Sequence, residues 1–256
     1  MLKINFKIKD IITCIITALL LGVVICCLRL SSSPYYTDMI PLESAFFSAR
    51  DGQIAFEQHH YTVLLLSSFL NILVFAPLII KTTMNDFKTA KAFLFIRSNN
   101  ISKWYGIKIF QSFTFSFIAG LFYNCSIIIC AAAMGYKAES TANALKYLFF
   151  CIIASTLITF YIVSIIQILS FKISDYFATA LIICIACVVL YTIHFAPLGL
   201  VEYNPLTLYF VSLQYTDIPN QQIFSFPIWL HYAVLLVLTI CNLSVGKIIL
   251  KKSDMI

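Results

Sequence analysis

Charged residues are scarce in this chain, and their scarcity excludes most soluble folds. Of its 256 residues only 11% are charged, whereas 61% are hydrophobic and 15% are aromatic. A soluble domain usually carries about 25% charged residues, and even domains of about 300 residues bury only about 75% of the surface of the unfolded chain. The composition therefore predicts an integral membrane protein, with a single domain over residues 1–256, and argues against a soluble enzyme.

Glycine and proline are also few, at seven each, which excludes a low-complexity or fibrous chain. The nine cysteines all fall within apolar stretches, so we expect most of them to be small core residues and not a disulfide framework. Cys184 and Cys187 form a CxxC motif with no histidine near in sequence, and the same spacing arises on one face of a helix. No metal site is predicted.

Six apolar segments are long enough to span a bilayer, which takes about 20 helical residues. They cover residues 11–30, 61–80, 107–133, 145–171, 177–195 and 228–250. The first exceeds a normal signal-peptide core and no A-x-A site follows it, so we expect it to be retained. The sequence thus predicts an all-α membrane protein with six transmembrane helices.

The basic residues predict how these helices are oriented, because Lys and Arg flanking a span stay on the cytoplasmic side. With the N-terminus inside, 13 of the 17 basic residues lie in inner segments. Only Arg29, Arg50, Lys137 and Lys146 lie outside. Both termini are therefore predicted to be cytoplasmic, and the net charge of +6 is a signal of topology and not of nucleic-acid binding.

The outer segment after the first span contains residues 41–52, PLESAFFSARDG, with apolar residues at the spacing i, i+3, i+4 and i+7. Pro41 suits a first helical turn, Glu43 and Arg50 complement the helix dipole, and Gly52 suits the end. We expect a short amphipathic helix at the outer membrane interface. The following His59 and His60 are adjacent and point to different sides, which disfavours a metal site there.

The inner segment 81–103 is basic and contains a helical pattern that begins after a possible N-cap at Asn85 or Asp86. A short helix is expected to end before the polar residues 98–100. It either lies on anionic lipid headgroups or docks a cytoplasmic partner.

The outer segment 196–227 has no Lys or Arg and contains a nine-residue apolar stretch at 205–213, too short to span. It is either a re-entrant or interfacial piece or a simple aromatic cap.

Nucleotide-binding and hydrolytic motifs are missing: there is no P-loop, H-E-x-x-H or G-x-S-x-G. We therefore expect no enzyme activity and no cofactor in this chain. No Asp, Glu, Lys or Arg lies near the middle of a predicted span, which disfavours ion coupling. The larger polar residues within the spans are expected to make helix-to-helix hydrogen bonds; they are Asn71, Gln111, Asn124, Gln167 and Asn242.

This arrangement of spans, basic inner loop and long outer segment resembles the ABC type-2 exporter permeases. The inner stretch FLFIRS at 93–98, followed by ISKWYGIK at 101–108, looks like that family's passage from the coupling helix into the third span, where Gly-x-Lys is common. The size and the lack of a large outer domain are similar to bacterial exporters of amphipathic or antimicrobial peptides, including those for phenol-soluble modulins. Residues 2–10 depart from the family, because they alternate apolar and polar residues where an amphipathic helix is usual.

The resemblance implies a permease in the bacterial cell membrane that pairs with a second copy or a paralogue. A separate ABC ATPase dimer, using ATP and Mg, would dock on the inner helix at Asp86, Phe87, Lys88, Lys91, Phe93 and Arg97. The second and fifth spans would line the translocation path, with Asn71, Phe75, Tyr191 and His194 on it. An outer re-entrant gate would include Pro205, Tyr209 and Phe210.

Three functions follow as hypotheses. The first is the membrane subunit of an ATP-driven exporter for a hydrophobic or amphipathic cargo, with peptide favoured. The second is a non-transport membrane protein, such as a sensor or a peptide-immunity protein. The third is a secondary carrier, which the uncharged spans disfavour.

Overall fold

The fold is entirely helical over the residues that the computed structural model describes, which are 7–30, 41–51, 70–97, 101–193 and 228–253. Within these ranges there is no strand. The predicted all-α class is therefore confirmed for this part of the chain. The helices are α1 (Ile8–Leu30), α2 (Leu42–Asp51), α4 (Leu70–Arg97), α5 (Ile101–Ala133), α6 (Thr141–Ser170), α7 (Asp175–Ile193) and α9 (Ile228–Ser253).

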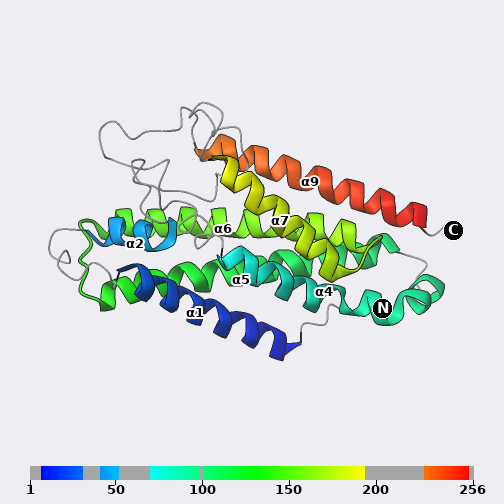
Figure 1. Cartoon of the computed structure of the whole chain (residues 1–256), viewed down its shortest axis with the longest axis horizontal. Coiled ribbons are helices and arrows are strands. Elements are labelled where there is room, and N and C mark those ends of the chain that lie inside the picture. Colours follow the sequence, from blue (N-terminus) through cyan, green and yellow to red (C-terminus); the bar gives the residue numbers. More distant parts are fainter. Residues whose placement is uncertain (1–6, 31–40, 52–69, 98–100, 194–227, 254–256) are drawn as a thin grey trace.

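The long helices form one elongated bundle in which successive helices alternate in direction (Figure 1). The central helix α5 contacts α1, α2, α4, α6 and α9, while α6 also packs against α7 and α9. α4, α6 and α9 end toward one end of the bundle, where α5 and α7 begin. We call this the basic end, because Lys103, Lys108, Lys172 and Lys247 lie toward these helix ends and turns.

Four helices of the described chain are long and apolar enough to cross a membrane: α1, Lys103–Ala133 of α5, α6, and Tyr232–Leu250 of α9. Their outward faces carry exposed large apolar side chains, such as Leu28 on α1, Phe110 on α5 and Ile248 on α9. Such extensive exposed apolar surface requires lipid as the solvent. The chain is therefore a multi-pass membrane protein, and these helices match the first, third, fourth and sixth predicted spans.

The second and fifth predicted spans correspond to the shorter apolar helices Leu70–Met84 and Asp175–Val189. Residues 61–69 and 194–195, which the predicted spans include, lie outside the described residues. The number of six spans therefore stays a prediction.

α4 continues without interruption through the predicted inner helix, so the boundary expected at Asn85 or Asp86 is wrong. The helix also continues through Pro77, which lacks the backbone N–H of an ordinary residue. Two threonine side chains bond to the helix backbone about one turn before the expected break. The hydroxyl groups of Thr82 and Thr83 both donate to the carbonyl of Ile79, at 2.9 and 2.7 Å.

The turn between α5 and α6 has a defined geometry that matters for α2. Gly135 adopts a φ of +99°, which favours glycine. Its N–H bonds to the carbonyl of Ala132 at 3.1 Å, and the N–H of Tyr136 bonds to that of Ala131 at 3.4 Å. This pattern of bonds closes the C-terminus of α5. It directs the chain into the N-cap of α6 at Ser140, whose side chain accepts from the N–H of Asn143.

Candidate functional site

The short helix α2 lies inside the bundle, in contact with α1, α5 and α6. Its predicted helical extent is confirmed, and the predicted apolar stripe of Leu42, Ala45, Phe46 and Ala49 is buried. α2 runs roughly parallel to α6 and is packed among the helices (Figure 1), whereas its predicted level at the outer membrane interface stays a prediction. Both locations need an apolar stripe, and the stripe alone does not distinguish between them.

Polar contacts hold the N-terminal end of α2 against the start of α6. The carboxylate of Glu43 accepts the N–H of Ser140 at 3.2 Å and that of Glu139 at 3.3 Å. The N–H of Leu42 donates to the carbonyl of Lys137 at 2.9 Å. Because the N-terminus of a helix carries partial positive charge, the Glu43 carboxylate also interacts favourably with the dipole of α6.

The C-terminal end of α2 is held by an arginine from α1. Arg29 donates from its guanidinium to the carbonyl of Ala49 at 2.8 Å. Ala49 is one of the last residues of α2, whose carbonyls have no partner within the helix. The positive charge of Arg29 also complements the C-terminal dipole of α2.

Arg50, also on α2, is completely enclosed, with 0% of its side chain exposed. Its Nε donates to Oδ1 of Asn124 on α5 at 2.9 Å, and its guanidinium donates to Oγ of Ser155 on α6 at 3.3 Å. Nδ2 of Asn124 donates in turn to Ser155 Oγ at 3.1 Å and to the carbonyl of Gly120 at 2.7 Å. One polar cluster, Arg50, Asn124 and Ser155, therefore joins α2, α5 and α6.

This cluster places a cationic side chain deep among the transmembrane helices. Ser155 is the fifteenth of the 30 residues of α6, and hence beside its midpoint. A lone arginine at the centre of a bilayer costs about 3 kcal/mol on insertion scales, so the hydrogen bonds to Arg50 are needed. No Asp, Glu, Lys or Arg occurs near the middle of a predicted span in the sequence. Arg50 lies outside the predicted spans, but α2 brings it next to the middle of α6. Arg50 follows Glu43 by seven residues and Phe46 by four, so the helical repeat places it on the same face as these buried residues. This spacing is the feature of the sequence that could have indicated its burial.

A second polar cluster, Thr83, Ser112 and Gln167, joins α4, α5 and α6 closer to the basic end. Nε2 of Gln167 donates to Oγ of Ser112 and to Oγ1 of Thr83, the latter at 3.3 Å. The predicted helix-to-helix hydrogen bonds of Asn124 and Gln167 are therefore confirmed. Asn71 instead accepts the N–H of its neighbour Ile72.

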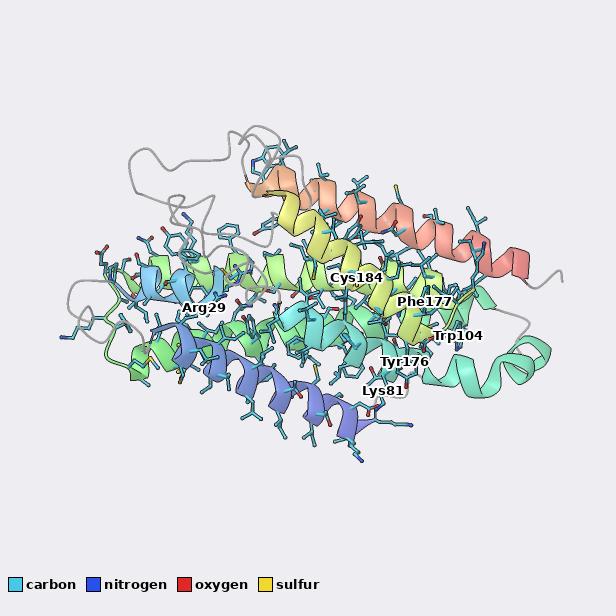
Figure 2. All side chains as sticks on the ribbon, in the orientation of Figure 1. Arg29, Lys81, Trp104, Tyr176, Phe177 and Cys184 are labelled. Atoms are coloured by element: carbon cyan, nitrogen blue, oxygen red, sulfur yellow. The ribbon has the colours of Figure 1, made fainter. Side chains whose placement is uncertain are left out.

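Basic and aromatic side chains gather at the basic end. Figure 2 shows Lys81, Trp104 and Tyr176 near this end, with Arg29 toward the opposite end. Tyr176 is 80% exposed on the outside of α7, and Nζ of Lys108 lies 5.9 Å from the centre of the Trp104 ring. An exposed tyrosine is typical of the level of lipid headgroups, whereas Trp104 and Lys108 are each only 5% exposed and belong to the protein interior.

The other predicted site residues are only partly described. Asn71 and Phe75 are buried in α4, and the six predicted docking residues belong to its C-terminal part, where only the backbone is described. Tyr191 lies in α7. His194, the predicted gate residues Pro205, Tyr209 and Phe210, and both outer histidines lie outside the described residues. Among the residues that are described, no group of three or more His, Cys, Asp or Glu could hold a metal ion.

Comparison with known proteins gives no relative: no family model, no curated protein and no solved structure matches this chain.

Proposed function

We propose that this chain is the membrane-spanning permease subunit of an ATP-driven exporter for a hydrophobic or amphipathic cargo, with peptide favoured. The chain supplies the path, and a cytoplasmic ABC ATPase dimer supplies hydrolysis of ATP with Mg. A second copy or a paralogue completes the path. The basic end faces the cytoplasm of a bacterial cell, with six spans and both termini on that side.

The observation that carries this proposal is the unbroken helix α4. Its first part is buried against α5, α6 and α7, and its last part carries the basic residues of the inner segment. Thr83, at the junction of the two parts, bonds to Gln167 of α6. A continuous helix links the two parts, so in this proposal a partner that moves residues 86–97 also moves the polar cluster Thr83, Ser112 and Gln167.

α2 supports the proposal from the opposite side of the membrane. It occupies space between α1, α5 and α6, and polar groups hold it at both ends. The charged side chains of Arg29 and Glu43 make these hydrogen bonds, and such bonds are worth about 1.5 to 3 kcal/mol each in soluble proteins, so separation of the two surfaces costs about that much per bond. In this proposal α2 closes the outer half of the path while no cargo passes. The segment 205–213 remains a further proposed part of the outer gate.

The proposal is tested by purification of the tagged chain from its native membrane in mild detergent. We expect a Walker-motif ATPase to co-purify in a defined ratio. After reconstitution in liposomes, an amphipathic α-helical peptide should stimulate ATP hydrolysis, and an unrelated polar peptide should not. Absence of any ATPase from the purified complex would contradict the proposal and favour the peptide-immunity hypothesis.

Docking on α4 is tested by substitution within residues 86–97. Interface energy concentrates in a few apolar anchors, so Phe87→Ala should weaken ATPase association by about 2 kcal/mol, which is roughly 30-fold. Changing Lys88 and Lys91 together to Ala should mainly alter association rate and salt sensitivity. An unchanged amount of co-purified ATPase for Phe87→Ala would contradict docking on this helix.

A further inference from the structure

Two cysteines from different helices face each other near the end of the bundle opposite the basic end. Sγ of Cys27 on α1 lies 3.9 Å from Sγ of Cys130 on α5. Each residue lies three positions before the end of its helix, so the two thiols have the same depth. Both residues are partly exposed on the surface of the bundle.

The packing of α1 on α5 keeps these thiols in register. A methyl group added to Gly22 on α1 would lie 2.8 Å from the carbonyl of Tyr123 and still closer to the Ser126 hydroxyl, so the two backbones are nearly in contact. Further along, the Cys26 thiol donates to the carbonyl of Ile127 at 3.6 Å. In this register Cys27 lies next to Cys130.

We propose that Cys27 and Cys130 form a redox-sensitive thiol pair that closes to a disulfide on the outer side of the membrane. An S–S bond is about 2.05 Å long, so each sulfur must move by only about 1 Å, which a small side-chain rotation achieves. The outer location rests on the orientation given under the proposed function. There the oxidant is an extracytoplasmic thiol oxidase, a protein that carries an exchangeable disulfide.

The reaction is thiol–disulfide exchange in two steps. One of the two cysteines, as the thiolate, attacks the disulfide of the oxidase, forms a mixed disulfide and releases one oxidase thiolate. The second cysteine thiolate attacks the mixed disulfide at the sulfur from this chain, forms the Cys27–Cys130 bond and releases the other oxidase thiolate. The two protons lost by the cysteines are taken up by the reduced oxidase, which has gained two electrons.

The bond would fix the outer end of α1 to α5 next to the inserted helix. Arg29, which holds the C-terminal carbonyl of α2, is only two residues after Cys27. Oxidation therefore adds a covalent restraint next to the arginine that anchors α2, and reduction removes that restraint. The pair gives the outer closure a means of responding to the redox state outside the cell.

The test counts free thiols in the full-length protein in isolated native membranes. The membranes are first reduced, then treated with diamide, denatured and labelled with a maleimide-polyethylene glycol. The wild-type chain should fall from nine labelled thiols to seven, and non-reducing peptide mapping should identify the Cys27–Cys130 link. Cys27→Ser and Cys130→Ser should each keep eight thiols, whereas the control Cys125→Ser on the same helix should fall from eight to six. Nine thiols in the oxidised wild type, or a link through Cys26, would overturn the proposal.

A second measurement tests oxidation in the cell. Growing cells are quenched with acid, and free thiols are blocked before lysis. Seven labelled thiols would support oxidation by the extracytoplasmic enzyme, and nine would overturn it. Neither result depends on ATPase co-purification, so failure of the thiol pair and failure of the exporter proposal are distinguishable.

Discussion

The hydrogen bond between Arg50 and Asn124 is expected to help hold α2 inside the bundle, and a double-mutant cycle measures its contribution. The variants are Arg50→Met, Asn124→Leu and the two together. Asn124→Leu leaves a buried guanidinium N–H without its acceptor at 2.9 Å. Arg50→Met removes the charge and leaves the Asn124 carbonyl oxygen without this donor. The double variant leaves neither group unpaired, so its loss of stability should be smaller than the sum of the single losses.

The expected size of this coupling follows from the geometry and the setting. A hydrogen bond to a charged group is worth about 1.5 to 3 kcal/mol in soluble proteins. Polar pairs between transmembrane helices average about 0.6 kcal/mol and reach about 1.7. Because Arg50 is fully enclosed and the Nε contact is short, we expect a value near the upper membrane figure, between about 1 and 2 kcal/mol. That range corresponds to roughly 5- to 30-fold in the unfolding equilibrium constant.

The assay is reversible unfolding in mixed detergent micelles with increasing dodecyl sulfate, followed by circular dichroism. Lys137→Met serves as the control, because it removes an exposed positive charge from the same end of the bundle. Its free energy of unfolding should change by less than about 0.5 kcal/mol. If the losses of the single variants add up to that of the double variant within about 0.5 kcal/mol, the Arg50–Asn124 bond contributes nothing and the reasoning is refuted.

Three further predictions concern packing, polar contacts and topology. Gly22→Ala should destabilise the protein by about 1 to 3 kcal/mol, because the added methyl overlaps the facing turn of α5, whereas Gly106→Ala, with no atom within 4 Å of the new methyl, should not destabilise it in the same unfolding assay. Gln167→Leu should cost about 0.6 to 1.7 kcal/mol through loss of its bonds to α4 and α5, and a variant as stable as wild type would contradict these contacts. In a cysteine-free background of intact cells, a cysteine at Lys137 should react with an impermeant thiol reagent and one at Lys172 should not; the opposite pattern would reverse the orientation.

Much of the helical framework could be predicted from the sequence, because the length of an apolar run is a local property. Residues 107–133 and 145–171 match α5 and α6 closely. The ends of α2 were predicted within one residue, since its i, i+3, i+4 and i+7 spacing and the residues at its two ends are also local signals. These helices can therefore be predicted without knowledge of their tertiary contacts.

The burial of α2 and the continuity of α4 depend on tertiary contacts. The sequence did not predict the burial, and it predicted the boundary within α4 incorrectly. An apolar stripe fits a lipid surface as well as a protein interior. Only the partners Asn124 and Ser155, more than 70 residues away in the chain, make burial of Arg50 favourable. Asn85 and Asp86 are frequent helix caps, but nothing in their local pattern shows that α4 continues past them.

The most direct test of the account joins α2 to α6 by a reversible covalent link. Phe47→Cys with Tyr147→Cys is introduced into a cysteine-free chain, because the centres of these two rings lie 5.2 Å apart. Phe47→Cys with Phe149→Cys is the control, since Phe149 lies on the exposed side of α6. The account predicts that a short bifunctional thiosulfonate links only the first pair, that the link abolishes peptide-stimulated ATP hydrolysis in the reconstituted complex, and that reduction restores it. Equal linking of both pairs, or full hydrolysis by the linked protein, would contradict the account of α2 as the outer closure of a transport path.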